Sequence, residues 1–423
     1  MRLAVVLISL QATTADAQDF TTLKGHGGPI MGLDISASGQ VVSASFDNAV
    51  GLWSDRTPQW LDAHDAAVIA VRHLPDGRIV SGGDDFSVQL WDNGTPTRLG
   101  RHKGKVTSFA LIGDTIASGS WDGTIGLWPL WGDDPPRMLD IGRGNINDLA
   151  VSPDGQTLYA ATSAGDILAV SLTTDAAARV LVRHGFAITK LALAPDAGWL
   201  AYGAVDGVTR VMNPETGEDL RDFSLERRPI LAMRYHEPTG QLAVGDGQGY
   251  IMMIDTDRWR ITRDFRATRK GPVWALAFTP DGQTLYAGGL DDVIYGWPVD
   301  LMNQFDPGIS GEPNFLRDTG AMPNGERQFM RKCSICHALT SRASRKAGPT
   351  LHGLFGRPAG TVPGYRYSDI LVGSPITWNA TTIDALFDLG PDQYIPGSKM
   401  PMQRITKPQD RKDLITFLEQ ATQ

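Results

Sequence analysis

The chain of 423 residues contains two cysteines, and both lie in the short segment Cys333-Ser334-Ile335-Cys336-His337. A disulfide between cysteines this close would close a small loop and add little stability. A zinc site would need two further ligands, and a thioredoxin-like redox pair would need a βαβ surrounding that this part of the sequence lacks. Attachment of haem uses all three residues, because two thiols add to the vinyl groups as thioethers and the adjacent imidazole then lies beneath the iron. We therefore predict one covalently bound haem c.

Two helices are expected to position this segment. The first, over residues 325–333, places Gly325 and Phe329 four residues apart on one face. The second, over residues 410–421, has an apolar side formed by Leu414, Phe417 and Leu418. We expect the two helices to cross at Gly325, because a glycine permits close approach of two backbones.

Three further stretches strengthen the haem interpretation. They are GPTLHGLFGR over residues 348–357, PGYRY over 363–367 and YIPGSKM over 394–400. With the cysteine motif, in this order, they resemble class I cytochrome c of the mitochondrial and α-proteobacterial kind. The resemblance covers roughly residues 318–423, and it implies a small all-α cytochrome c domain, which we assign to residues 321–423.

The resemblance also implies roles for individual residues. Met400 matches the second axial ligand of the iron, opposite His337. The carbonyl of Pro349 would accept a hydrogen bond from the far nitrogen of His337 and so fix its tautomer. The remaining matches are haem-environment residues: Tyr367 and Trp378 for hydrogen bonds to a buried propionate, and Arg357 for the stabilising cation.

The sequence departs from the family pattern at several positions. Phe387 stands where a tyrosine usually contacts the axial sulfur, so that tuning contact should be missing. Met402 is a second thioether near the iron, and we interpret it as a packing residue because Met400 holds the family position. Asp392 and Gln393 occupy positions that are often lysine, which thins the basic docking face of the family.

Residues 20–300 repeat with a period close to forty residues, the period of a WD-type β-propeller. The third strand of each repeat is expected to end at Trp53, Trp91, Trp128, Val170, Met212, Ile254 and Trp297. The tight-turn position, six residues earlier, holds Asp47, Asp85, Asp122, Ala164, Asp206, Gln248 and Asp291. Strand alternation on both sides of turns such as Asp122-Gly123 completes the pattern.

This part resembles the WD40 family closely, which implies an all-β propeller with seven blades over residues 18–300. In that family a His, Ser, Asp and Trp of each blade form a hydrogen-bonded set. His26, His64, His102 and His184 precede their turn aspartates by 20 to 22 residues. We therefore assign these four histidines a structural role. Blades four and six have lost the His and the Asp, and we expect weaker bracing there; His73 and His236 lie outside the pattern.

The ends of the propeller part make two further predictions. Because a propeller must not leave open strand edges, residues 19–24 should supply the outermost strand of the last blade, begun near residue 270. Residues 301–320, with Asp306-Pro307-Gly308 and no usable periodicity, are predicted to be a linker.

The N-terminus has the pattern of a secretory signal. Residues 1–17 carry Arg2, a short apolar stretch and an A-x-A site at Ala15-Asp16-Ala17. We expect cleavage after Ala17, a mature chain from Gln18 and a periplasmic location. No segment reaches the roughly 20 apolar residues of a membrane span, so the product should not be membrane-spanning.

Charge differs between the two parts. Residues 318–423 carry 13 Lys and Arg against 9 Asp and Glu, whereas the rest carries 26 against 38. The acidic surplus argues against nucleic acid as a partner of the propeller. It also allows the acidic propeller to dock on the basic haem domain of its own chain and make the haem edge less accessible.

With both axial positions filled, the iron has no open site, and outer-sphere electron transfer is the expected function rather than enzymatic catalysis. The propeller would then be a platform on which redox protein partners dock, near the haem edge. Periplasmic nitrite reductases, which join a cytochrome c domain to an eight-bladed propeller with a second haem, offer an alternative at the level of fold, in which the propeller is the oxidoreductase. A redox sensor or scaffold is a second alternative. The sequence identifies neither electron donor nor acceptor.

Overall fold

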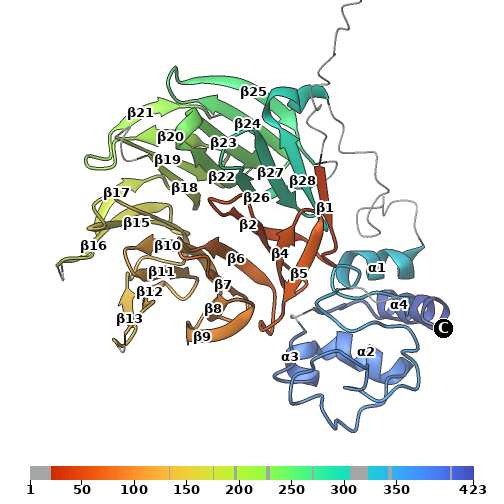
Figure 1. Ribbon diagram of the computed structural model, residues 1–423. Helices are drawn as coiled ribbons and strands as arrows, with labels where there is room; N and C mark the ends of the chain where they lie inside the picture. The colour runs from red at the N-terminus through yellow and green to blue at the C-terminus, as the bar shows by residue number, and fades with distance from the viewer. Residues whose placement is uncertain are drawn as a thin grey trace, which may run out of the picture.

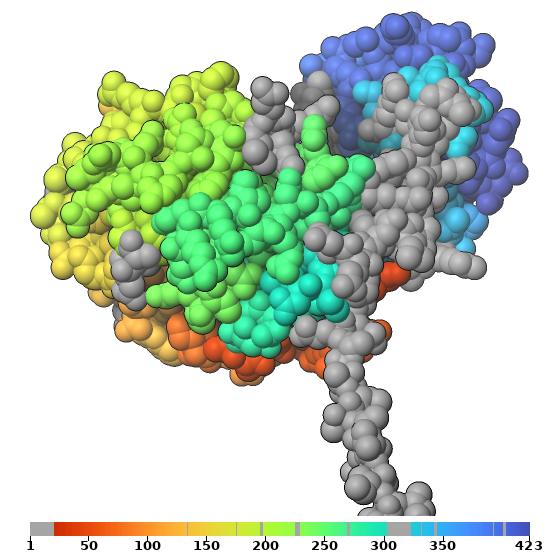
Figure 2. All heavy atoms as spheres, turned by 90° about the horizontal axis from the view of Figure 1, so that it is seen from above, coloured from red at the N-terminus to blue at the C-terminus, as the bar shows by residue number. Residues whose placement is uncertain are grey.

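The computed structural model describes residues 21–132, 134–174, 176–194, 198–224, 229–268, 271–304, 323–341, 345–400 and 403–423. The strands of these residues form seven four-stranded antiparallel sheets, and the helices follow them in the chain. Figure 1 shows the sheets arranged in a ring, and Figures 1 and 2 show the helical part as a lobe set against one side of the propeller. The expected architecture, an all-β seven-bladed propeller followed by a small all-α domain, is confirmed.

Each sheet is one blade, and its strands are given from the innermost to the outermost. Blade 1 contains β2 (Ile30–Ile35), β3 (Val41–Ser45), β4 (Val50–Ser54) and β5 (Thr57–Leu61); blade 2 contains β6 (Val68–His73), β7 (Ile79–Gly83), β8 (Ser87–Asp92) and β9 (Thr95–Arg101). Blade 3 contains β10 (Val106–Ile112), β11 (Thr115–Ser120), β12 (Thr124–Pro129) and β13 (Arg137–Asp140); blade 4 contains β14 (Ile146–Val151), β15 (Thr157–Thr162), β16 (Asp166–Ser171) and β17 (Arg179–Arg183). Blade 5 contains β18 (Ile188–Ala194), β19 (Trp199–Ala204), β20 (Thr209–Met212) and β21 (Asp219–Asp222); blade 6 contains β22 (Ile230–His236), β23 (Gln241–Asp246), β24 (Tyr250–Asp255) and β25 (Arg260–Arg266). Blade 7 contains β26 (Val273–Phe278), β27 (Thr284–Gly289), β28 (Val293–Pro298) and, from the start of the chain, β1 (Thr21–Lys24).

The ring closes through β1, as the sequence predicted. This strand pairs antiparallel with β28, and Leu23 lies opposite Ile294. Leu23 is 1% exposed and packs in the core shared by blades 7 and 1. The N-terminal strand therefore covers an edge that would otherwise expose unpaired backbone groups of β28.

Neighbouring blades fit together by one repeated device. The innermost strand of every blade shifts register once near its start, for example between Ile30 and Gly32 in β2. Such bulges add local twist to the strand. Glycines in the second strands leave room for a β-branched side chain of the next blade; the pairs are Gly82 with Val106, Gly119 with Ile146, Gly203 with Ile230, Gly245 with Val273 and Gly288 with Ile30.

The predicted histidine sets are present in the first three blades. In blade 1 the two ring nitrogens of His26 lie 2.9 Å from a carboxylate oxygen of Asp47 and 2.7 Å from the hydroxyl of Ser43, which also accepts a hydrogen bond from Trp53. Blades 2 and 3 repeat the His–Ser–Trp arrangement. The structural interpretation of these histidines is confirmed.

The later blades are braced differently. In blade 5, His184 keeps a 2.9 Å contact with Asp206. In blade 6, where the turn position holds Gln248, the buried carboxylate of Asp246 accepts hydrogen bonds from the backbone N–H groups of Gln248 and Tyr250. A carboxylate two residues before the usual position therefore holds this turn.

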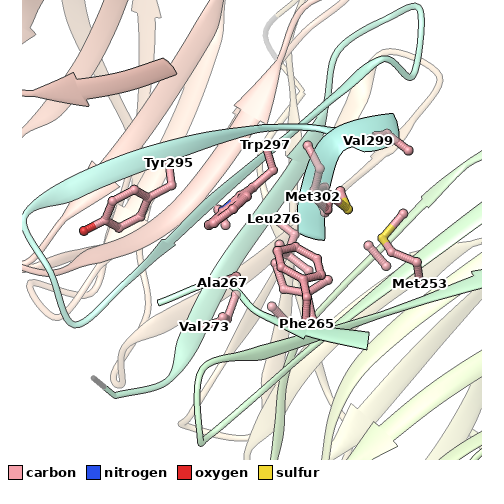
Figure 3. Close-up of a cluster of buried hydrophobic side chains, with 14 of the residues drawn as sticks. Met253, Phe265, Ala267, Val273, Leu276, Tyr295, Trp297, Val299 and Met302 are labelled. Atoms are coloured by element: carbon pink, nitrogen blue, oxygen red, sulfur yellow. The ribbon is translucent and has the colours of Figure 1, made fainter. Parts of the chain in front are cut away.

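The junction of blades 6 and 7 extends past the last strand. A short 3-10 helix, η3 (Val299–Gln304), places Val299 and Met302 over a cluster that includes Phe265 and Trp297, as Figure 3 shows. The ring centroids of Phe265 and Trp297 are 5.0 Å apart, with the rings edge to face. The chain thus stays packed on blade 7 through Met302, inside the predicted linker. The other 3-10 helix of the described residues is η2 (Glu237–Thr239) in blade 6.

The C-terminal part consists of α1 (Asn324–Lys332), α2 (Ala380–Leu389), α3 (Pro391–Tyr394) and α4 (Pro408–Ala421). Helices α1 and α4 cross at Gly325, where a Cβ atom would lie 2.0 Å from the carbonyl oxygen of Asp413. This confirms the predicted crossing. Arg411 of α4 ties the crossing to α2, since its guanidinium lies 2.8 Å from Asp384 and 2.9 Å from Asp388. None of the helices in the described part of the chain has the length and apolarity that a bilayer span requires.

Candidate haem site

The cysteine motif begins where helix α1 ends. The N–H of Cys333 donates to the carbonyl of Phe329 at 2.8 Å, and the N–H groups of Cys336 and His337 donate back to the carbonyl of Cys333 at 3.0 and 2.8 Å. This turn directs both sulfur atoms inward, and the two cysteines are buried and free. The helix thus presents two thiols and an imidazole to one space.

Burial determines the charge of the two thiols. It raises the pKa of Cys333 to about 12 and that of Cys336 to about 11. Both groups are therefore neutral thiols near pH 7, whereas a thiol–disulfide catalyst needs an exposed thiolate of lowered pKa. Nor do three or more His, Cys, Asp or Glu side chains come together to hold a metal ion anywhere in the described ranges.

His337 is oriented by the loop that follows the motif. Its Nδ1 donates to the carbonyl of Pro349 at 2.8 Å, as the sequence predicted, which leaves Nε2 available as a ligand. The N–H of Gly348 donates to the carbonyl of Cys336 at 2.8 Å and holds this loop in place. A Cβ on Gly348 would lie 2.4 Å from the imidazole, so only glycine fits there. Burial lowers the pKa of His337 and so favours the neutral ring, the form that binds metals.

Met400 reaches the same space from the other end of the domain. After α3, the N–H of Ser398 donates to the carbonyl of Ile395 at 3.0 Å, and Gly397 takes a φ of 86°, which a residue with a side chain rarely adopts. The turn leaves Met400 partly buried against the helical core. Met402 lies outside the described residues, so its interpretation as packing stays a prediction.

These groups line one cavity of about 570 Å³. Cys333, Cys336, His337 and Met400 all border it. The remaining wall within the helical part includes the apolar side chains of Leu351, Leu354, Leu371, Ile383, Leu386, Phe387, Ile395 and Leu418. The volume lies within the range of roughly 300–1,000 Å³ that cofactor pockets occupy. Two buried thiols, a neutral imidazole and a thioether in an apolar cavity fit a covalently attached haem.

The other predicted haem-environment residues border the cavity as well. The guanidinium of Arg357 donates to the carbonyls of His352 and Thr350 at 2.7 and 2.9 Å. The hydroxyl of Tyr367 accepts a hydrogen bond from the N–H of Val362 at 3.2 Å. With Trp378, both line the cavity, while their contacts to haem carboxylates stay a prediction. Phe387 is buried there too and, as the sequence indicated, offers no hydroxyl.

One wall of the cavity was not predicted. It comes from blades 1 and 2 of the propeller and consists of Phe46, Asn48, Asp65, Ala66, Ala67, Asp84, Asp85 and Arg101. The opposite charges of the two parts indicated mutual attraction, but no local motif marks these residues. Sequence reasoning could not identify them, because they reach the cavity only through the packing of one domain on the other.

The comparisons with known proteins agree with this site. Residues 323–422 match the family model for cytochrome c, and residues 18–54, 56–92, 95–129 and 259–297 match the model for the WD domain, G-beta repeat. Cytochrome c of Cochliobolus lunatus is 45% identical over 105 residues, which are 25% of this chain and 96% of that protein. Cytochrome c of Sesamum indicum is 45% identical over 105 residues, 24% of this chain and 92% of the relative. For cytochrome c of Ginkgo biloba the identity is 45% over 98 residues, 23% of this chain and 86% of the relative.

The likeness to these relatives spans nearly their whole length and the C-terminal quarter of this chain. The propeller in front of it carries the repeats that the WD model matches in blades 1, 2 and 3 and again towards the end of the ring. A cytochrome c domain implies haem c and suggests electron transfer, and a WD40 propeller suggests protein interaction. The chain therefore belongs to the cytochrome c family, with its cytochrome c domain joined to an N-terminal seven-bladed WD40 propeller.

Proposed function

We propose that this protein is a periplasmic monohaem electron carrier whose propeller is the platform on which a redox protein partner docks. The observation that carries the proposal is the meeting of Cys333, Cys336, His337 and Met400 at one cavity. If His337 and Met400 both bound the iron, no position would be left for oxygen or peroxide chemistry. Outer-sphere electron transfer is the function that such a site supports.

The residues of the site would have different roles. Cys333 and Cys336 would hold the haem through two thioether bonds, and His337 and Met400 would bind the iron. When bound, the haem supplies a reversible one-electron iron couple. The carbonyl of Pro349, 2.8 Å from Nδ1 of His337, keeps the imidazole in one tautomer and strengthens it as a donor.

The haem carboxylates need polar partners, because burying an unpaired carboxylate is costly. Arg357, Tyr367 and Trp378 border the cavity and would supply a cation and two hydrogen-bond donors. The hydroxyl of Tyr367 accepts one hydrogen bond from the backbone and keeps its own proton to donate. Arg357 has five N–H groups, of which two donate to carbonyls, so donors remain for a carboxylate.

A periplasmic location is supported by the signal pattern of residues 1–17. The propeller as a platform is supported by its WD40 repeats and its acidic surplus. A partner bound to the ring would be held near the haem domain of the same chain, and tethering of this kind raises the effective concentration for electron delivery.

The haem content of the protein, produced in a bacterium that matures c-type cytochromes, tests the proposal. We expect one c-type haem per chain, retained under denaturing conditions, in a periplasmic product that begins at Gln18. The variant Cys333→Ala/Cys336→Ala should lose haem that survives denaturation, while the matched change Ser108→Ala in the propeller should keep it. A second haem or another chromophore would instead favour a propeller with its own redox chemistry.

A deletion tests the platform separately. Removing residues 18–310 also removes the propeller residues that line the haem cavity, so the rate to the physiological partner is compared with the rate to a small redox reagent that needs no platform. The deletion should lower the ratio of the first rate to the second. An unchanged ratio would contradict the role of the propeller as a platform.

A further inference from the structure

The propeller closes one side of the haem cavity. Loops on one rim of blades 1 and 2 line it, contributed by the turn between β3 and β4, the connection between β5 and β6, and the turn between β7 and β8. From these loops Phe46, Ala66 and Ala67 add apolar surface, and Asp65 adds a carboxylate. The haem domain therefore presents one side of its cavity to its own propeller, and we call this side the mouth of the cavity.

Three ion pairs hold the two parts together at this mouth. The carboxylate of Asp65 lies 2.9 Å from the guanidinium of Arg366 and 2.9 Å from the ammonium of Lys399. Arg345 pairs with the carboxylate of Asp62. Lys399 directly precedes Met400, so the carboxylate of Asp65 lies close to the segment that carries the proposed axial ligand.

Close packing accompanies the ion pairs. The guanidinium of Arg345 lies over the ring of Trp60, 4.4 Å from its centroid, a favourable cation–π geometry. The backbone of Arg345 lies directly against Gly27, where no Cβ would fit. Arg366 also donates to the carbonyl of His64 at 2.6 Å. The contact thus combines charge, an aromatic ring and a fitted backbone.

We propose that this rim is a built-in cap over the haem cavity, and that the cap limits electron exchange through the cavity mouth until the two parts separate. The cap is formed by Phe46, Asp65, Ala66 and Ala67, which line the cavity, and by Gly27, Trp60 and Asp62, which hold Arg345 of the haem domain beside them. The proposal rests on the proposed function, since it concerns how that haem is reached, and it adds a mode of control: ionic strength, or a partner that binds the rim, uncovers the haem.

The ion pairs of the cap are exposed to solvent and therefore weak enough to open. The side chain of Asp65 is 49% exposed and that of Asp62 is 58% exposed. An ion pair as exposed as these changes the equilibrium between the docked and separated states by only about two- to fivefold. Because both parts belong to one chain, the docked state forms again without diffusion of a second molecule. Removing both carboxylates should therefore shift the docking equilibrium by on the order of tenfold.

The test compares the full-length, haem-loaded protein with the variant Asp62→Asn/Asp65→Asn. Electron exchange is measured with two small reagents of opposite charge: oxidation of the reduced protein by ferricyanide, and reduction of the oxidised protein by hexaammineruthenium(II). Each passes one electron to or from the iron without forming a bond. The control is Asp114→Asn/Asp134→Asn, an equal change of charge at exposed positions of blade 3. Small-angle scattering reports the separation of the two parts independently of redox activity.

In the cap variant we expect both rates to rise by about tenfold. The radius of gyration should also increase, because the two parts separate. In the control, the rates and the radius should stay unchanged. Raising the ionic strength of the unmodified protein from about 0.01 M to about 0.5 M should have the same effect, because the Debye length shrinks from about 30 Å to a few ångströms. Unchanged rates and radius would overturn the cap. So would rates that move in opposite directions for the two reagents at constant radius, since that result shows only a change of local charge. A protein without haem would refute the proposed function, while the scattering comparison would still test the docking.

Discussion

The crossing of α1 and α4 gives a prediction in which two effects on stability oppose each other. Replacing Gly325 by alanine should favour helix α1 by up to about 1 kcal/mol, because alanine has the higher helix propensity. The new Cβ would lie 2.0 Å from the carbonyl oxygen of Asp413 and 2.9 Å from Cβ of Phe417. Neither atom is the end of a flexible side chain, so the two helices must move apart.

That movement decides whether the substitution stabilises or destabilises the domain. It loosens the packing of Phe329 on Phe417, whose ring centroids are 5.6 Å apart, and overpacking of this kind costs typically about 1–3 kcal/mol. Because the clash involves backbone, we expect the upper part of this range and a net loss of about 1–2 kcal/mol for Gly325→Ala. For a domain of roughly 100 residues this lowers the melting temperature by about 5–15 °C.

The measurement is thermal unfolding of the full chain, followed in the haem absorption band for the cytochrome domain and in the far-ultraviolet for the propeller. Only the first transition should move. The control Thr416→Ala, an exposed position of α4, gains helix propensity without a clash and should leave the transition unchanged or slightly raised. If Gly325→Ala proved as stable as the parent chain, the helices would not need a glycine at this crossing.

Three further predictions concern other parts of the molecule. Burial raises the pKa of Asp85, but the interaction with His64 and the backbone hydrogen bonds of Asp65 and Ser87 together outweigh it and lower the pKa from 3.8 to about 2. This stabilisation is present above the unfolded pKa and is lost as pH falls through about 4 towards 2, so Asp85→Asn should cost roughly 2 kcal/mol at pH 7 and flatten the pH dependence of unfolding in that window. Met400→Ala should lower the reduction potential by on the order of 0.1 V and remove the magnetic signature of methionine ligation, whereas the exposed Met138→Ala should change neither. Leu23→Ala, in the strand that closes the ring, should destabilise the propeller by about 2–4 kcal/mol in denaturant unfolding.

The fold could be predicted where each blade carries its own signal. The turn aspartates, the histidines and the strand-ending tryptophans recur at a fixed period, so seven blades and the closing strand followed from the sequence. The bracing of blade 6 could not be predicted from the sequence, because Asp246 caps its turn from two residues before the usual position and matches no repeat signal. The extension of the propeller through Met302 could not be predicted either, since it depends on a hydrophobic cluster built from two blades.

The haem site divides in the same way. Cys333, Cys336 and His337 are adjacent in the chain, and Pro349 and Met400 lie in short motifs, so their places could be predicted without a structure. The wall supplied by blades 1 and 2 lies nearly three hundred residues away in the chain. The regional charges indicated that the two parts attract each other, but residue charge alone does not say which loop of a ring meets the cavity.

The structural histidine sets and the haem domain are connected through the same loops. The N–H of Gly27, on which the backbone of Arg345 rests, donates to the carboxylate of Asp47 at 2.8 Å. The N–H of Asp65 donates to the carboxylate of Asp85 at 3.0 Å. Both acceptors belong to the histidine sets of blades 1 and 2, in which the histidine lies within 3.0 Å of both the aspartate and the serine. The haem domain thus rests on loops whose backbone is hydrogen-bonded to these sets, and a loop held in this way loses little conformational entropy each time the two parts dock.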